Sequence, residues 1–360
     1  MTEKRPHLNI IDSRFLELDA LRGLAAMMVV LFHYTINSNG ALLGWEFRYG
    51  VTGVDIFFMI SGFVIFLTIS RVRQWQDFVV SRFARLYPAF WFCMFLTAIV
   101  TMFFEPELVG MERVLANMTM MPIFFGQENI DQSYWTLLVE LIFYFWILIL
   151  LVIGDINRIV SVGLALTISI ILFHAFSSQY PSFHEFATRK IELLNHFPLF
   201  FSGILFYLIR NGNQVRRNSI LIIFSLLAAC FLHYQGGRAQ YHVTPTEHYV
   251  ILAIFHIVFA LAIFGKLGFL NQAPLLFLGK ISYCLYLIHQ YIGMRLLLIF
   301  TDFWHMNIYP ALLITIAMVV FIAYLVNKFV EIPANLLIRN WYKHRNQKGS
   351  PARSREIAVQ

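Results

Sequence analysis

Residues 18–34 read LDALRGLAAMMVVLFHY, an apolar stretch interrupted by two residues unsuited to lipid, Arg22 and His33. The two are eleven positions apart, which at about 100° per residue is three turns plus ~20°. On a helix they would project from one face, roughly 16 Å apart along the axis. This helix would hold a fixed cation near one membrane surface and a titratable imidazole near the other.

The composition of the whole chain is that of an integral membrane protein. Of the 360 residues, 59% are hydrophobic and 13% are charged, about half the charged fraction of soluble proteins. The formal net charge of +7 does not indicate nucleic-acid binding, because polytopic proteins concentrate basic residues in cytoplasmic loops. Cys93, Cys230 and Cys284 each lie inside an apolar run, so we expect buried thiols and no disulfide or metal site.

Ten segments are long and apolar enough to span a bilayer as helices. Their approximate limits are 18–38, 51–70, 86–104, 134–153, 158–175, 193–210, 219–235, 249–268, 281–300 and 309–328. No soluble domain, internal repeat or low-complexity segment is recognisable. The predicted fold class is therefore all-α, a polytopic membrane helix bundle of about ten transmembrane helices.

Basic residues indicate the orientation of these spans. If the spans alternate, one side of the membrane receives Lys4, Arg5, Arg14, Arg71, Arg73, Arg82, Arg85, Arg158, Arg210, Arg216, Arg217, Lys266, Lys280, Arg339, Lys343, Arg345, Lys348, Arg353 and Arg355. The other side receives the longest connection, 105–133, which is acidic apart from Arg113. By the positive-inside rule, both termini are expected to be cytoplasmic.

With that orientation, ionisable residues from three spans are expected in the outer half of the membrane. Counting 1.5 Å per residue, His33 lies about 7 Å, Asp55 about 6 Å and Glu140 about 9 Å from the outer surface. An imidazole beside a carboxylate suits general-base catalysis, because the carboxylate orients the ring while the other nitrogen takes a proton from a hydroxyl. The alternative is that these groups merely pair to satisfy one another in lipid.

A candidate anion site is expected at the cytoplasmic side. Arg82 and Arg85 open the third predicted span in SRFARLYP, and paired arginines suit phosphate oxygens. Both could instead be positive-inside anchors. Arg22 could bind an anion entering from the cytoplasm, snorkel to the interface, or pair with Asp19 three residues earlier.

The last two predicted spans carry further polar residues. His289 lies near mid-membrane in the ninth span, where either a packing role or a functional role is open, and this span is expected to be broken near Gly293. Glu331 and Pro333 follow the tenth span in VEIPAN, where we expect a structural stop of the helix.

Taken together, these motifs resemble the acyltransferase 3 family of integral membrane acyltransferases. The resemblance rests on FLELDALRGLAAMMVVLFHY, GVTGVDIFFMISGFVIF, SRFARLYPAFW, YWTLLVELIFYF, ISYCLYLIHQ and VEIP, which follow in family order. It implies a membrane domain over residues 16–333 that moves an acyl group, commonly acetyl, from acyl-CoA to a hydroxyl of a surface or lipid-linked glycan. The implied location is the cytoplasmic (inner) membrane, as a multi-pass protein in contact with membrane lipid.

Motif by motif, the resemblance makes His33 the catalytic histidine and puts Glu140 at the family's acidic position, with Asp55 as a second candidate partner. Arg22, Arg82, Arg85 and His289 are the predicted donor-binding residues. No permanently bound cofactor and no metal are expected, because acetyl-CoA is a co-substrate. Segments 1–15 and 334–360 would be cytoplasmic, and the esterase-like domain fused to some members is expected to be absent.

Two other classes of protein compete with this interpretation. A secondary transporter or proton-coupled permease would use His33, Asp55 and Glu140 as a proton relay, and would favour inverted repeats, which are not clear here. A scaffold membrane protein would leave these three residues at similar depth unexplained.

Overall fold

The computed structural model describes residues 15–70, 72 and 74–348, and this part of the chain contains helices and no β-strand. The α-helices are α1 (Leu16–Thr35), α2 (Ser38–Leu43), α3 (Gly53–Ile69), α4 (Trp75–Phe104), α5 (Met111–Met118), α6 (Trp135–Ile153), α7 (Ile159–Ala175), α8 (Pro181–Lys190), α9 (Leu193–Arg210), α10 (Val215–Phe231), α11 (Pro245–Ile263), α12 (Ala273–Ile288), α13 (Tyr291–Leu298), α14 (Ile308–Val326) and α15 (Ile332–Lys348). Eight helical segments in the described ranges are long and apolar enough to cross a membrane, and the bent pair α12–α13 would be a ninth. The all-α polytopic architecture is therefore confirmed.

Helices occur at all ten predicted positions, although the number of spans stays a prediction. The first predicted span, α1, is not among the eight, and its first two turns carry Glu17, Asp19 and Arg22. The prediction that Arg82 and Arg85 open the third span is wrong, because α4 already begins at Trp75. The helix starts there because Asp77 Oδ2 accepts the backbone N–H of Gln74 at 3.2 Å, which caps the first turn.

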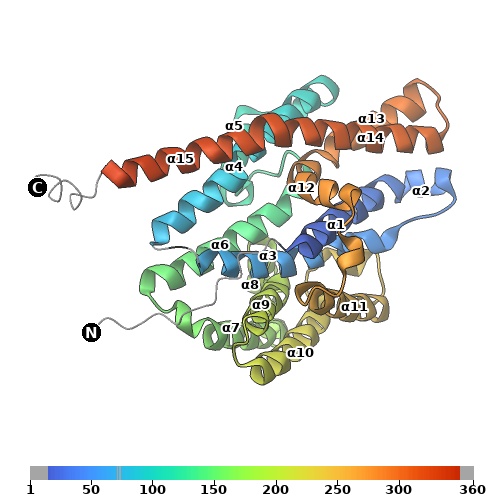
Figure 1. Ribbon diagram of the computed structural model, residues 1–360. Helices are drawn as coiled ribbons and strands as arrows, with labels where there is room; N and C mark the ends of the chain where they lie inside the picture. The colour runs from blue at the N-terminus through green and yellow to red at the C-terminus, as the bar shows by residue number, and fades with distance from the viewer. Residues whose placement is uncertain (1–14, 71, 73, 349–360) are drawn as a thin grey trace, which may run out of the picture.

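The bundle has a central group of helices between two outer groups. In Figure 1, α4, α14 and α15 lie along one side, α10 and α11 lie along the opposite side, and α1, α3 and α12 lie between them. α1 packs closely on α12 and α3, and α3 packs closely on α9. The motif-bearing helices α1, α3 and α12 thus lie in the middle of the bundle, together with the largely buried α9.

Glycines permit the closest of these helix crossings. A Cβ atom on Gly23 of α1 would lie 2.7 Å from the backbone nitrogen of Gly279 on α12. A Cβ atom on Gly62 of α3 would lie 2.0 Å from the carbonyl oxygen of Phe200 on α9. Small residues allow membrane helices to approach until their backbones touch. Gly62 therefore lies at a close contact between the backbones of α3 and α9.

Two irregular turns change the course of the last helices. The α12–α13 pair bends by 76° across His289 and Gln290, so the ninth predicted span is broken slightly before Gly293. The stop predicted at Glu331 and Pro333 is wrong, because α14 continues through a π turn, Asn327–Glu331, into α15. Pro333 has no N–H to donate, and the wider π turn accommodates the missing helical hydrogen bond.

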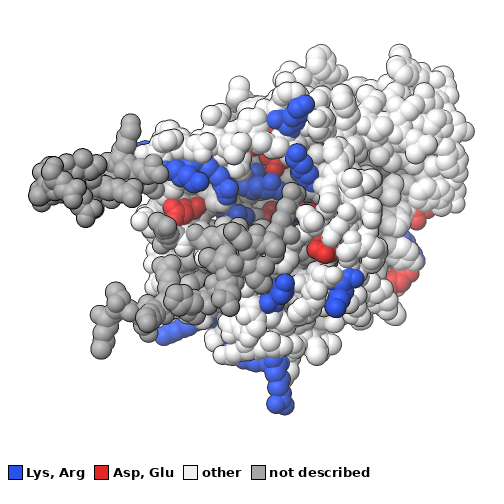
Figure 2. Space-filling view, in the orientation of Figure 1, with Lys and Arg blue, Asp and Glu red and all other residues white. Residues whose placement is uncertain are grey.

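Figure 2 shows Lys and Arg side chains gathered on one face, most densely around a hollow near α15. This clustering is what the positive-inside rule expects of a cytoplasmic face, and the assignment of that side stays a prediction. Among the predicted cytoplasmic residues, Lys4, Arg5, Arg14, Arg71, Arg73, Arg353 and Arg355 lie outside the described residues, as do most of segment 1–15 and the end of segment 334–360.

Gly62→Ala is expected to destabilise the bundle. The added methyl group would meet the Phe200 carbonyl oxygen at 2.0 Å, and overpacking of this kind costs about 1–3 kcal/mol. The measurement is the apparent Tm of the purified protein in detergent. Gly268→Ala is the matched control, because a Cβ atom there meets nothing within 4 Å. Equal Tm values for the two variants would contradict the proposed backbone contact.

Candidate active site

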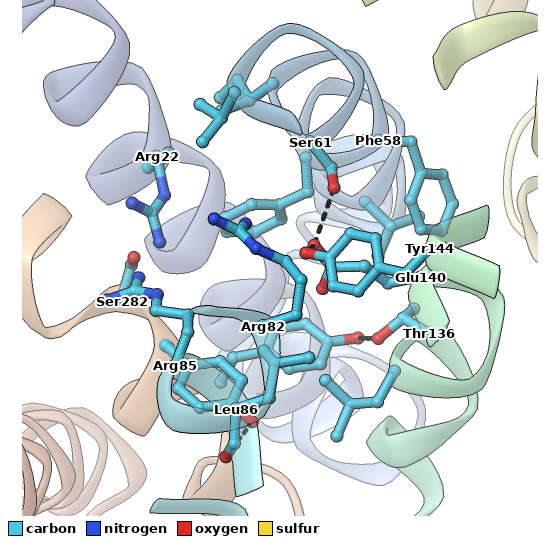
Figure 3. Close-up of a pocket in the computed structure, with 17 residues that line it drawn as sticks. Arg22, Phe58, Ser61, Arg82, Arg85, Leu86, Thr136, Glu140, Tyr144 and Ser282 are labelled. Carbon is cyan, nitrogen blue, oxygen red and sulfur yellow. Dashed lines mark hydrogen bonds between the residues drawn. The ribbon is translucent and has the colours of Figure 1, made fainter. Parts of the chain in front are cut away.

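The three predicted donor-binding arginines line one cavity of about 130 Å³ between the helices. Arg22 comes from α1, and Arg82 and Arg85 come from α4. Figure 3 shows Arg22 and Arg82 extending toward each other across this space, with Glu140 of α6 on its far side. We call this space the arginine cavity. The fold thus brings together four of the seven predicted site residues: Arg22, Arg82, Arg85 and Glu140.

Each arginine in this cavity is held differently. Arg85 Nη1 donates to Glu331 Oε1 at 2.6 Å, and Arg22 lies 4.0 Å from Asp19 Oδ1, which confirms the local pair predicted there. Arg82 Nη2 donates to the Thr68 hydroxyl at 2.9 Å. The structure shows no carboxylate at ion-pair distance from Arg82 within the described ranges, and its buried Nε has no partner. Of the three arginines, Arg82 is therefore the one best able to bind an anion that enters the cavity.

A larger cavity of about 440 Å³ adjoins the arginine cavity. Arg22 and Arg85 line both. Lys280 and Asp19 also line this second cavity, which lies at the end of the bundle predicted to be cytoplasmic. We call it the entry cavity. An anion that enters here meets fixed cations at the point where the two cavities join.

His33 lies in a third cavity, of about 360 Å³. We call it the histidine cavity. Trp135, Arg238 and Gln290 also line it. Val54 and Tyr286 line both the histidine cavity and the arginine cavity. Arg22 and His33, which share one face of α1, therefore lie on adjoining cavities between the helices, as their spacing predicts.

His289 is the imidazole ring that packs beside His33. The two ring centroids are 5.2 Å apart, and His289 is fully buried. Its Nδ1 lies 2.8 Å from the carbonyl oxygen of Tyr286. Because a carbonyl can only accept, Nδ1 carries the hydrogen and Nε2 is left as a buried acceptor without a partner. The bend after Ile288 thus puts His289 beside His33 and not among the arginines, where it was predicted.

The structure does not bring Asp55 to His33. His248 Nε2 of α11 donates to Asp55 Oδ2 at 3.1 Å, and His248 Nδ1 lies 2.8 Å from Nδ1 of His233. The reason is helical rotation, since Gly53 of α3 contacts α1 and two further residues turn the side chain by about 200°. Asp55 therefore faces away from α1 and toward His248 of α11.

Glu140 is also separate from His33, because it lies deeper in the bundle than the sequence suggested. Ser61 Oγ donates to Glu140 Oε1 at 2.7 Å, and the Tyr144 hydroxyl donates to the same oxygen. Ser61 is six residues beyond Asp55 along α3, which is about 9 Å. The start of α6 is itself buried, with Trp135 only 6% exposed, so a depth counted from that residue is too shallow.

Sequence reasoning missed several residues of these cavities. Trp135 and Tyr286 stand inside the recognised YWTLLVE and ISYCLYLIHQ motifs, so motif position could have suggested them. Arg238 lies in a short 3-10 turn between α10 and α11, and nothing in its local sequence marks it. His248, which pairs with Asp55, stands in the first two turns of α11 without any recognisable motif.

Comparisons with known proteins show the family to which the chain belongs. The model of the acyltransferase 3 family, described as an acyltransferase domain, matches residues 15–327. Over 100 residues the chain is 33% identical to a peptidoglycan O-acetyltransferase of Listeria monocytogenes, a match that covers 26% of this chain and 14% of that protein.

Two further relatives match over a longer part of the chain. A putative peptidoglycan O-acetyltransferase of Bacillus subtilis is 26% identical over 76% of this chain and 47% of its own length. A putative acetyltransferase of Acidianus two-tailed virus is 23% identical over 75% of this chain and 80% of its own length. No solved structure matches the chain.

Glu331→Gln is expected to lower the stability of the protein. Glu331 is 3% exposed and accepts hydrogen bonds from Arg85, from Cys284 Sγ at 3.1 Å and from Asn327 Nδ2 at 2.7 Å. A neutral amide would weaken the charged contact with Arg85, which for such groups costs about 1.5–3 kcal/mol. Unfolding in detergent measures the loss. The control is Glu107→Gln at an exposed site, and an equal effect of both changes would contradict this role.

Proposed function

The chain belongs to the acyltransferase 3 family, and from this premise we propose that it transfers an acetyl group from cytoplasmic acetyl-CoA to a hydroxyl of a glycan. The enzyme class follows from the family and leaves the transporter and scaffold alternatives without support. The proposal of acetyl-CoA as donor and a glycan hydroxyl as acceptor rests on the series of adjoining cavities. Cations line one end of this series and His33 lines the other.

The donor would enter from the side proposed to be cytoplasmic. Coenzyme A carries phosphates, which cannot enter lipid cheaply, so they would remain near Lys280, Arg22 and Arg85 of the entry cavity. The thin pantetheine arm would extend past Arg82 toward Val54 and Tyr286. The distance from Arg22 to His33 along α1 is about 16 Å, a span that an extended arm of this kind suits.

The acceptor would enter the histidine cavity from the outer side. His33 would take the proton of its hydroxyl while the oxygen attacks the thioester carbonyl carbon and a new C–O bond forms. Collapse of the tetrahedral intermediate then breaks the C–S bond, and the departing thiolate takes a proton, so the overall reaction neither releases nor consumes a proton. Transfer is proposed to be direct. Ser38 lines the histidine cavity, but no hydrogen bond joins it to His33, so it lacks the contact with a base that would activate it as a nucleophile.

His289 is proposed to orient His33 in place of the carboxylate that the sequence suggested. Its unpartnered Nε2 can accept a ring N–H from His33 once the two rings approach. This hydrogen bond would leave the other nitrogen of His33 free as the base. An imidazole partner is neutral, so it would orient His33 without the charge stabilisation that an aspartate supplies.

Glu140 would then act on the donor side. Its carboxylate, held by Ser61 and Tyr144, lies in the arginine cavity through which the pantetheine arm would pass. Amide N–H groups of that arm could donate to it. We propose that the protein lies in the inner membrane and that the acceptor approaches it from the outer side. Both proposals rest on the distribution of the basic residues between the two sides.

His33→Asn is expected to lower acetyl transfer by at least about 100-fold, because removal of a general base typically has this effect. The assay follows labelled acetyl from acetyl-CoA to glycan with purified protein in vesicles. Unchanged protection against heating by acetyl-CoA would show that the variant still folds and binds the donor. Transfer at the wild-type rate by this variant would overturn the mechanism.

Arg82→Gln is expected to raise the KM for acetyl-CoA by about 10-fold or more, because one charge-assisted contact to an anion is lost. The value of kcat should change much less, since Arg82 lies outside the histidine cavity. Arg158→Gln, a surface change on a side chain that is 73% exposed, is the control and should leave KM as it is. A loss confined to kcat would contradict donor binding by Arg82.

A further inference from the structure

The histidine cavity contains a cation that the proposed reaction has not used. Resting on the proposed acyl transfer, we infer that Arg238 and Trp135 form a subsite for an anionic group of the sugar acceptor, a carboxylate or a phosphate. The acceptor would thus be an acidic glycan, with its anionic group bound in the same cavity as His33.

Arg238 is held in a defined position by an aromatic ring. Its guanidinium carbon lies 4.5 Å from the ring centroid of Trp135, and Trp135 is 6% exposed at the buried start of α6. The guanidinium group is planar, and stacking on an aromatic face fixes the orientation of its N–H donors. Two of these donors can then bind the two oxygens of one carboxylate or phosphate at the same time.

The positive charge of Arg238 is not neutralised within the described part of the chain. None of the ion pairs found there includes Arg238. Asp55 lines a small neighbouring cavity together with Arg238, but its carboxylate is paired with His248. Glu192, just before α9, also makes no ion pair with Arg238. Burial raises the pKa of Glu192 to about 7 even though Arg238 opposes this shift. Burial therefore favours the neutral form of this carboxyl, and Arg238, without an ion pair, is able to bind another anion.

The rest of the histidine cavity suits a sugar ring. Asn37, His242 and Gln290 offer polar groups for hydroxyls, and Phe32 and Tyr286 offer apolar faces. A volume of about 360 Å³ is in the range of small-ligand pockets, which start near 300 Å³. An anionic group bound to Arg238 would orient the ring, so that one of its hydroxyls faces His33.

Arg238 is also separate from the donor arginines. Arg22, Arg82 and Arg85 line the arginine cavity, and Arg238 does not. Its removal should therefore alter the use of the acceptor without altering the use of acetyl-CoA. This separation provides a readout that a purely structural role for Arg238 would not reproduce.

The test compares three glycans of equal length with the full-length protein in vesicles. One glycan is neutral, one carries a uronic carboxylate and one carries a sugar phosphate. We expect kcat/KM for the preferred anionic glycan to exceed that for the neutral glycan by about 10-fold or more, as one charge-assisted contact supplies. The comparison between the carboxylate glycan and the phosphate glycan shows which of the two groups the subsite binds better.

Variants at Arg238 then connect this preference to the residue. Arg238→Gln should remove the preference, with a larger loss of kcat/KM on the anionic glycan than on the neutral glycan and an unchanged KM for acetyl-CoA. Arg238→Lys should restore part of it. Arg48→Gln is the matched control, since Arg48 pairs with Glu247 at 2.5 Å away from these cavities. Equal use of neutral and anionic glycans by the wild-type protein, or an equal loss on both in Arg238→Gln, would overturn the inference.

A binding measurement separates this inference from the proposed function. The anionic glycan should raise the Tm of the wild-type protein but not that of Arg238→Gln. If no glycan is acetylated but this difference in Tm persists, the proposed reaction fails and the subsite stands. If transfer occurs without any preference and anionic and neutral glycans raise Tm equally, the subsite fails and the reaction stands. If Arg238→Gln does not fold, the wild-type preference between glycans decides.

Discussion

Backbone contact at glycines is the constraint on which the rest of this structure depends. Gly23 brings α1 against Gly279 of α12, and Gly53 brings α3 against the backbone of α1 at Ala25. Bilayers provide little hydrophobic drive for helices to associate, so such close van der Waals contact provides much of the adhesion. With α1 held between these two neighbours, its polar face is turned into the bundle, where Arg22 and His33 line cavities rather than meet lipid.

The charges inside the bundle are divided between its two ends. Toward the entry cavity, Arg85 and Glu331 compensate each other, whereas Arg82 has only hydroxyl partners within the described ranges. Around the histidine cavity, the groups are His33, His289 and the guanidinium of Arg238. Burying an unpaired ion in a medium of low dielectric constant costs free energy. An anionic substrate therefore stabilises the protein most where it binds a cation that has no carboxylate partner.

The local breaks in the helices have a direct chemical consequence. The 76° bend between α12 and α13 ends the regular hydrogen bonding beside His289, and the Tyr286 carbonyl is bonded to the imidazole Nδ1. That bond determines the tautomer of His289 and leaves its Nε2 as a buried acceptor nitrogen without a partner. The π turn before α15 similarly directs Glu331 toward Arg85 in the interior of the bundle. An end of the helix at this position, as the sequence predicted, would have left Glu331 at the membrane edge.

The sequence by itself determined the class of the protein, the positions of its helices and the common face of Arg22 and His33, because hydropathy and helical period are local properties. Through motif order it also indicated three arginines, Arg22, Arg82 and Arg85, which the structure brings to one cavity. Only the tertiary structure decided the partners: Asp55 with His248, Glu140 with Ser61 and Tyr144, His289 with His33, and Arg238 with Trp135. Depth along a helix follows from counting residues, but the direction in which a side chain faces depends on the rotation and offset of each helix, which packing between distant segments sets.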